Sequence, residues 1–367
     1  MSRIQVKVNS KIFEEWEKVT INRTLNNMCG SFSMLLYYDY TDGTSTPPPL
    51  SGRIQISHLD DFGFETKVMT GYIDDVNSSI AGPTGLMLEI SGRDITCDMI
   101  DSTVETSISE LNELTVSDAL QQLIAPFNIT LSSTSSKLQN QVKKKAQSPD
   151  EKVGAIISTI CKKVGVLPLT DENGDLIVED KVGGTISGGL QMGVNILNAS
   201  HNASHRNRYS QITVLGNGDN ELSELAVSGG STAEDGVAID SSYESSRRRV
   251  LTVIGSNVDR NDKGALEEEA NWKMAMSRAS VSKVKIKVHD WLTTDSGELY
   301  KVNRLINCDL SRIGLSKSNM LISSITFEMD KSSGTFTNMQ LIHEDAYNDK
   351  TFESKDSDKL NVLSVGS

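Results

Sequence analysis

The sequence is poor in aromatic residues and cysteines. Phe, Tyr and Trp make up 5% of its 367 residues, too few to supply the stacked rings that bind single-stranded nucleic acid or sugars. The four cysteines, Cys29, Cys97, Cys161 and Cys308, lie too far apart for a CxxC metal or redox motif and are too few for a disulfide framework. We interpret them as reduced, mostly buried thiols of a protein that is made in a reducing cytoplasm.

Long apolar runs and positive charge are scarce as well. No stretch approaches the roughly 18 uncharged apolar residues of a membrane span, and the start lacks an apolar signal core, so we expect no membrane insertion. Lys and Arg number 36 against 49 Asp and Glu, a formal net charge of -13. Because nucleic acid is bound by neutralising its phosphates, we expect no sequence-specific nucleic-acid binding by the chain as a whole.

One local basic pattern stands out against this acidic background. Lys283, Lys285 and Lys287 alternate with apolar residues and predict a strand with one apolar and one basic face. Such a face is usually a solvated outer surface. The alternative is a face that lines a channel or meets an acidic partner.

Motifs for catalysis and for metal binding are missing. His201 and His205 stand four residues apart, but their surroundings give no helix signal and no Glu lies between them. Gly216-Asn-Gly218 lacks the third glycine of a dinucleotide fingerprint, and the sequence contains neither a P-loop nor a nucleophile elbow. We predict no catalytic residue, no metal and no cofactor, and we favour a structural protein over an enzyme.

Residues 1–103 alternate with the period of two that is typical of strands, for example at Ile4, Val6 and Val8, and predict a first antiparallel β domain. Between Asp39 and Gly52 the three consecutive prolines cannot join a central sheet, because each removes a backbone donor. We expect an exposed loop there, either a variable excursion or a contact arm toward a neighbouring subunit.

Residues 104–190 change to helical patterns and predict a small α+β domain. A helix capped by Thr115 should run up to Pro126, and a second should start at Ser148 with Glu151 in its capping box and stop at Gly165. A hairpin should follow.

Residues 191–346 return to strands and include a predicted helix at about 263–281. Within this part we expect a polar loop over 216–246 and a buried strand over 250–254. Residues 347–367 are polar and should form a disordered tail.

A series of short blocks along the chain carries a family resemblance. The most telling pair is Gly71-Tyr-Ile-Asp74 and Ser91-Gly-Arg-Asp94, separated by a hairpin. The others are Ile90 to Asp101, the helices after Thr115 and Ser148, Arg208 to Gly216, the helix ending near Arg278, His289-Asp-Trp291, and Leu321 to Phe327. Taken in order, up to about residue 346, they resemble the baseplate hub proteins of Mu-like contractile-tailed phages, a family related to the late control protein D hubs.

This resemblance implies a homotrimer whose subunits each contribute two tube-like β-barrels, so that six similar barrels surround a central channel. Such a ring would match the sixfold tail tube on one side and the threefold central spike on the other, next to other baseplate proteins. It implies a virion protein of the tail baseplate, assembled in the host cytoplasm and taking part in genome ejection. The two-barrel expectation rests on the resemblance, because the sequence shows no internal repeat.

The expected fold is therefore mainly β with an α+β insertion: two tube-like β-barrel domains plus a small α+β domain. Two other functions stay open, a hub or spike component of a type VI secretion system or contractile bacteriocin, and a cell-wall hydrolase carried in the baseplate. The candidate interface residues are Asp42, Pro47, Pro48, Pro49, Lys283, Lys285 and Lys287.

Overall fold

The computed structural model of the protein describes residues 3–13, 16–39, 48–60, 62–81, 85–105, 111, 113–142, 150–180, 182–216, 235–243, 247–255 and 263–344. Their strands form one 13-stranded sheet and two three-stranded sheets, so the fold is mainly β as predicted. No helix among these residues is long and apolar enough to cross a membrane. The expected tail at 347–367 lies outside the described residues.

The first barrel consists of antiparallel strands in the order β3-β4-β7-β6-β5-β1-β2. Side chains alternate between core and surface as the period of two predicted, with Ile4, Val6 and Val8 buried. The strands are β1 (Arg3–Val8), β2 (Lys11–Phe13), β3 (Trp16–Thr24), β4 (Asn27–Asp39), β5 (Arg53–Leu59), β6 (Glu65–Ala81) and β7 (Gly85–Asp94).

A helical unit with its own core follows the first barrel. It contains α1 (Thr96–Asp101), α2 (Val116–Ile124), α3 (Val153–Val164), the strands β8 (Leu131–Ser133), β9 (Val166–Thr170) and β10 (Leu176–Asp180), and two 3-10 turns, η2 (Ala125–Phe127) and η3 (Ser136–Gln139). Thr115 caps α2 by accepting the backbone N–H of Asp118 (3.1 Å), as predicted. The prediction for α3 was wrong at its start, because the helix begins at Val153 after Lys152; Ser148 lies outside the described residues.

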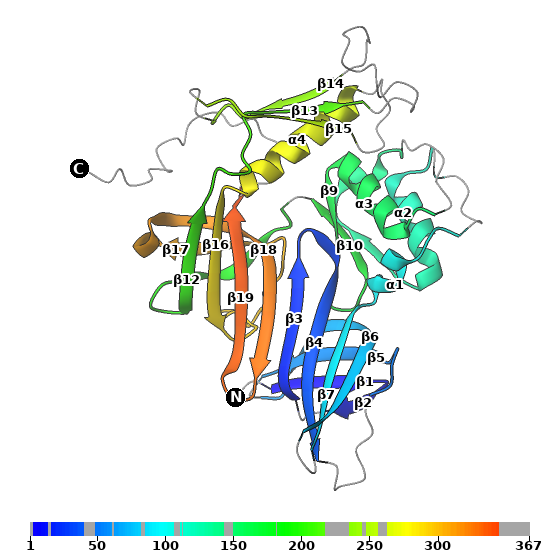
Figure 1. Ribbon diagram of the computed structural model, residues 1–367, viewed down its shortest axis with the longest axis vertical. Coiled ribbons are helices and arrows are strands. Elements are labelled where there is room, and N and C mark those ends of the chain that lie inside the picture. The colour runs from blue at the N-terminus through cyan, green and yellow to red at the C-terminus, as the bar shows by residue number, and fades with distance from the viewer. Residues whose placement is uncertain are drawn as a thin grey trace.

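A small α/β unit lies at the top of Figure 1, where α4 (Lys263–Ala279) covers one face of the sheet β14-β13-β15. The strands are β13 (Gln211–Leu215), β14 (Asp235–Ile239) and β15 (Val250–Ile254). Strand β14 corrects the expectation of a continuous loop over 216–246. The expected buried strand at 250–254 has only one covered face, since Val250 and Ile254 are exposed.

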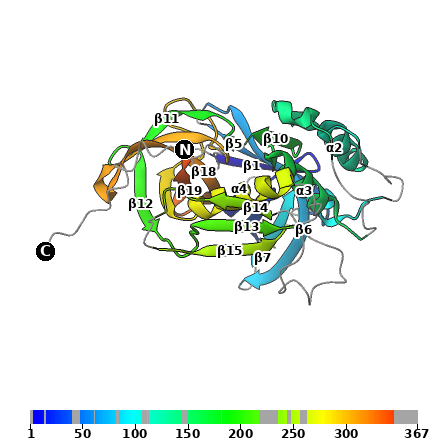
Figure 2. The same ribbon diagram turned by 90° about the horizontal axis from the view of Figure 1, so that it is seen from above.

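The second barrel is built from β12-β16-β19-β18, continued by β17 and β11. Its strands are β11 (Thr185–Gln191), β12 (Ile196–Ala203), β16 (Ser282–His289), β17 (Leu305–Leu310), β18 (Leu315–Asp330) and β19 (Gly334–His343), with a short 3-10 turn η4 (Ser311–Ile313). Strand β11 spans the expected domain limit at residue 190. Figure 2 shows the α/β unit lying across this body when the molecule is seen from above.

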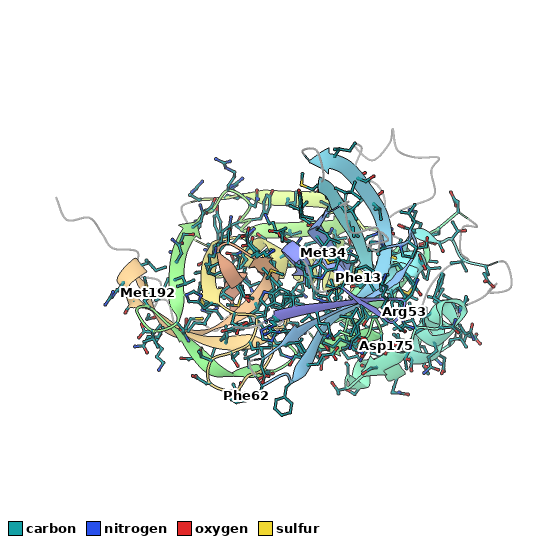
Figure 3. The ribbon with its side chains drawn as sticks, turned by 90° about the horizontal axis from the view of Figure 1, so that it is seen from below. Phe13, Met34, Arg53, Phe62, Asp175 and Met192 are labelled. Atoms are coloured by element: carbon teal, nitrogen blue, oxygen red, sulfur yellow. The ribbon has the colours of Figure 1, made fainter. Side chains whose placement is uncertain are left out.

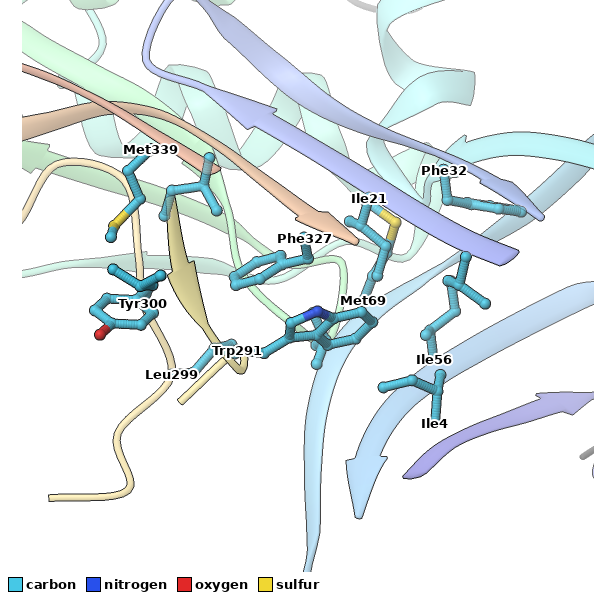
Figure 4. Packing of buried hydrophobic residues seen from close by; sticks show 14 of the residues in the cluster. Ile4, Ile21, Phe32, Ile56, Met69, Trp291, Leu299, Tyr300, Phe327 and Met339 are labelled. Carbon is cyan, nitrogen blue, oxygen red and sulfur yellow. The ribbon is translucent and has the colours of Figure 1, made fainter. Parts of the chain in front are cut away.

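One hydrophobic core runs through both barrels. Its buried residues come from β1 and β5 of the first barrel as well as from β16, β18 and β19 of the second. Figure 4 shows Trp291 and Phe327 of the second barrel close to Ile21 and Met69 of the first. The two barrels are therefore packed as one body.

Candidate interaction surfaces

Strand β18 changes its pairing partner along one edge. Its first half pairs with β17 and its second half, from Ser324, pairs with β3, while β19 pairs with its other edge from Met320 to Asp330. At the change the β18–β19 ladder shifts between Ile322 and Ser324, leaving Ser323 as a bulge. The hydroxyl of Ser323 donates to the Gln340 carbonyl (2.9 Å) and its carbonyl accepts the N–H of Leu25 (2.9 Å), so the bulge leaves these groups satisfied.

The β18–β3 ladder joins the barrels by apolar and polar pairs. Phe327 lies opposite Ile21, and both side chains are buried. On the other face Thr326 donates to Asn22 Oδ1 (2.8 Å). Beyond the end of the ladder, Lys331 forms an ion pair with Glu17 (2.8 Å). Each directly opposed pair in such a ladder contributes roughly 0.2–1 kcal/mol.

A second contact between the barrels surrounds Trp291. His58 on β5 is buried, and its Nε2 lies 2.7 Å from the Asp290 carboxylate. The Asp290 carboxylate also accepts the N–H of Trp291 (2.7 Å), and the indole N–H donates to the Glu328 carbonyl (3.0 Å). Burial opposes ionisation of Asp290, but the bonds from His58 and Trp291 outweigh it, so the pKa of Asp290 lies below its ordinary value.

The strands β12-β16-β19-β18-β3-β4-β7-β6 form a continuous layer, here called the shared wall. One face of the wall carries the common core and is covered by β1, β5, β11 and β17. The opposite face, here called the polar face, bears mainly small polar side chains. One row of directly paired residues crosses seven strands of it: Arg93, Ser31, Asn22, Thr326, Asn338, Lys287 and Asn198.

The three predicted lysines lie on this polar face. Lys283 and Lys285 are exposed. Lys287 is half-buried, with its Nζ 4.0 Å from the Phe336 ring centre and 4.0 Å from the Glu328 carboxylate. The structure thus places the basic stripe on an extended open surface that spans both barrels. Whether it meets an acidic partner stays a prediction.

The predicted loop residues are only partly described. Asp42 and Pro47 lie outside the described residues. Pro48 is buried and Pro49 is exposed, and the carbonyl of Pro49 accepts the N–H of Gly52 (3.1 Å). The structure does not bring these prolines and the lysines together in one described contact.

An aromatic turn was missed by the sequence analysis. Phe62 and Phe64, in the turn between β5 and β6, are 89% and 74% exposed, and Figure 3 shows Phe62 projecting from the body. Asp60 Oδ1 accepts the N–H groups of both residues (2.9 and 2.8 Å), which fixes the turn. The sequence did contain a signal for this turn, since Phe62-Gly-Phe64 follows two aspartates. Asp and Gly favour turns, and aromatic residues of the core are seldom found in a turn, so two phenylalanines there indicate an exposed aromatic surface.

The paired sequence blocks of the family resemblance meet in the structure. Gly71 and Gly92 lie on β6 and β7, and a Cβ on either would come 2.0 Å from a carbonyl of the other strand. Arg93 forms ion pairs with Asp74 and Asp101 (both 2.8 Å). The two blocks therefore mark the place where the backbones of the neighbouring strands β6 and β7 lie unusually close together.

Asp94, at the end of the second block, fixes the helical unit to the first barrel. This fully buried carboxylate accepts the N–H of Gly30 (2.6 Å) and the hydroxyl of Thr96. Arg23 lies 3.8 Å from it and donates to the Thr170 carbonyl (2.6 Å). Because these groups come from both units, the orientation between the units is set by hydrogen bonds.

The described residues contain no cluster of three or more His, Cys, Asp or Glu side chains suited to a metal ion. His201 instead lies on β12, with its Nε2 2.9 Å from the Ser282 hydroxyl. The surfaces found above are suited to contacts between macromolecules: an open polar face, a fixed aromatic turn and long strand edges.

Three family models match successive parts of the chain. The N-terminal model of the Mu phage baseplate assembly protein GpP-like family matches residues 3–94. The second-domain model of the baseplate hub protein gp44-like family matches residues 96–180, and the fourth-domain model of GpP matches residues 263–350. The matches follow the order of the units described above.

Individual proteins agree with these models. Baseplate hub protein gp44 of Escherichia phage Mu is 23% identical over 351 residues, covering 92% of this chain and 87% of that protein. The 43 kDa tail protein of prophage MuSo2 from Shewanella oneidensis has a TM-score of 0.81 at 23% identity, covering 94% of this chain and 99% of that one. The E. coli c3393 protein, a type VI secretion component, has a TM-score of 0.55 at 12% identity over 94% of this chain and 76% of that one.

Proposed function

Because this chain belongs to the baseplate hub proteins of Mu-like contractile-tailed phages, we propose that three copies of it close into a pseudo-sixfold ring that joins the sixfold tail tube to the threefold central spike. The protein is a structural component of the tail baseplate. Its further partners in this proposal are other baseplate proteins, and its assembly takes place in the host cytoplasm before it enters the virion.

The observation that carries the proposal is that the two barrels share one strand order. In spatial order, the series β3-β4-β7-β6-β5-β1 of the first barrel matches the series β12-β16-β19-β18-β17-β11 of the second. The first five strands of each series are paired antiparallel throughout, and the series differ only at their last pair, since β1 is antiparallel to β5 whereas β11 is parallel to β17. The connections before β5 and β17 also agree. Ser51 (φ 58°) and Asn303 (φ 59°) both adopt the left-handed conformation, and both donate their N–H to the carbonyl of the equivalent isoleucine, Ile73 or Ile322.

Two equivalent barrels in one chain resolve a mismatch of symmetry. A threefold ring of single barrels would offer three equivalent surfaces to a sixfold tube, whereas two barrels per subunit offer six near-equivalent ones. The helical unit and the α/β unit occur once in each subunit, so they leave the other side of the ring threefold. In this arrangement the polar face lines the passage, because the opposite face of the shared wall is already covered.

A mass measurement tests the proposal. Light scattering of the purified protein should give three times the chain mass of 40.1 kDa, and images of the same sample should show a ring with a central hole. A monomer at high protein concentration that binds neither tube nor spike protein would contradict the proposed ring.

The fold alone does not separate a phage tail from a type VI secretion apparatus, since the c3393 protein shares this fold. The assignment to a phage rests on the three domain models.

A further inference from the structure

Two strand edges of the shared wall are open. The second half of β6, residues 74–81, pairs with β7 on one side, and no described residue pairs with its other side. At the opposite end of the wall β12 pairs with β16, and over residues 198–203 its outer side has no described partner. Open edges of this length are templates for pairing with another chain.

These two edges are the counterparts of the two edges that already pair within the chain. In the strand correspondence above, β6 is the equivalent of β18, and β12 is the equivalent of β3. The β18–β3 ladder holds the two barrels together inside one subunit. In a ring of six similar barrels, the same joint has to recur between subunits, where only β6 of one copy and β12 of the next are left to form it.

The positions of the β-bulges show which residues of the first barrel correspond to which residues of the second. The β6–β7 ladder shifts at Asp74 as the β18–β19 ladder shifts at Ser323. The β12–β16 ladder shifts at Leu197 as the β3–β4 ladder shifts between Trp16 and Lys18. Counting from these bulges, Thr326 corresponds to Asn77 and Asn22 to Asn202, and the Thr326–Asn22 pair of the internal joint therefore predicts a definite pair between subunits.

We infer that residues 76–81 of β6 pair antiparallel with residues 198–203 of β12 of the next copy, with Asn77 opposite Asn202, Ser79 opposite Ser200 and Ala81 opposite Asn198. This inference rests on the proposed ring and names the surfaces that close it. The contact is heterologous, so in a threefold ring it recurs three times and pairs both of the open edges found among the described residues of each shared wall.

The chemistry of the two edges fits such a joint. Residues 76–81 and 196–203 contain no Lys, Arg, Asp, Glu or Pro, although charges and prolines are what keep exposed edges of monomeric proteins apart. Ile80 is 85% exposed, while its counterpart Met329 packs against the core at the internal joint. In the predicted ladder Ile80 lies opposite Ala199, which would cover it in the same way.

The predicted joint is weaker in side-chain packing than the internal one. The Phe327–Ile21 pair of the internal joint is replaced by Ser78 opposite His201. The joint between subunits must therefore depend more on main-chain hydrogen bonds, as in other cases of strand addition. This agrees with a joint that forms after the subunit has folded.

Disulfide trapping tests the register. Opposed residues in an antiparallel ladder have Cβ atoms about 4.5–5.5 Å apart, whereas diagonal neighbours are about 7–8 Å apart. We expect the double variants Ser79→Cys/Ser200→Cys and Ser78→Cys/His201→Cys, which sample both kinds of ladder pair, to give covalent trimers on mild oxidation. The single variants, and the offset pair Asn77→Cys/Asn198→Cys, should stay monomeric on a denaturing gel.

The outcomes separate this inference from the proposed function. A protein that is trimeric by mass but forms no covalent trimer from either in-register pair, or forms one from the offset pair, would overturn the inference and leave the ring standing. Covalent products that stop at the dimer would show an isologous contact and also overturn it. A monomeric wild-type protein would contradict both the inferred joint and the proposed ring.

A charge at the joint gives a second readout. Ile80→Glu should weaken trimer assembly by about tenfold or more, because it buries an unpaired carboxylate. The matched control Ile12→Glu alters a 48% exposed isoleucine on β2, which is outside the predicted joint, and should assemble normally. Equal behaviour of the two variants in sedimentation would contradict the predicted place of β6.

Discussion

At the scale of single residues, buried carboxylates connect parts of the chain that are distant in sequence. Asp94 fixes the helical unit to the first barrel. Asp240 connects segments within the α/β unit, where its fully buried carboxylate lies 2.9 Å from Nε of Arg208, just before β13, and 3.3 Å from Nε of Arg278 on α4. Burial opposes ionisation of Asp240, but the bonds from Arg208 and Ser242 and the nearby arginine charges outweigh it, so the pKa of Asp240 lies below its ordinary value of 3.8.

Replacing Asp240 should therefore destabilise the α/β unit in a pH-dependent way. A carboxylate with a lowered pKa stabilises the fold above its ordinary pKa, and that contribution is lost as the pH falls through the lowered value. At pH 7 we expect Asp240→Asn to lose about 3 kcal/mol, because Arg208 and Arg278 stay buried without their counter-charge. The difference from the wild type in denaturant unfolding should shrink below pH 3.8; a pH-independent difference would contradict the ion-pair explanation.

The cysteines behave at this scale as the sequence analysis interpreted them. Cys97, Cys161 and Cys308 are buried and Cys29 is partly buried, and all four are free thiols. Burial is the main cause that raises the pKa of Cys97, Cys161 and Cys308 to about 12. Because the thiolate is the reactive form, these three are poor nucleophiles at neutral pH, which keeps them from interfering with the disulfide trapping.

At the scale of elements, the close approach of β6 and β7 depends on two glycines, Gly71 and Gly92. We expect Gly92→Ala to cost about 3 kcal/mol, since the added methyl would lie 2.0 Å from the Tyr72 carbonyl and 2.6 Å from the Phe32 ring. The matched control is Gly189→Ala on β11, where the nearest atom lies at an ordinary 3.4 Å. Thermal unfolding measures both variants, and equal losses would show that the close approach of the two strands does not set the cost.

Several elements could be predicted because their signals are local. The alternation of Ile4, Val6 and Val8 indicated β1, and Thr115 with Asp118 indicated the start of α2. Strand β14 was missed because its five residues lie in a long polar segment. The outer face of β15 was misjudged because Val250 and Ile254 are apolar but uncovered.

At the scale of the whole molecule, the three predicted lysines lie on the polar face of the shared wall. If the stripe meets an acidic partner, as predicted, the triple variant Lys283→Glu/Lys285→Glu/Lys287→Glu should impair tail assembly, because it reverses the charge of the stripe. Assembly is measured as infectious particles or as complete tails in electron micrographs.

Two controls make this result specific. The matching Lys→Gln triple variant removes the charge without adding repulsion and should impair assembly less. Lys317→Glu changes an exposed lysine near the start of β18 and should have no effect. Normal tails from the Glu variant would show that the stripe is an ordinary solvated face.

The core-facing residues, the course of many strands and helices and the absence of catalytic motifs could be predicted from the order of residues, since each depends on neighbours a few positions apart. That the two barrels share one strand order and one wall could not be predicted in this way, because it depends on contacts between distant parts of the chain. Thr326 and Asn22, which meet at their joint, are 304 residues apart, and the equivalent strands of the wall share bulge positions with few identical side chains. Such an equivalence lies in the backbone, so it becomes visible only when the chain is folded.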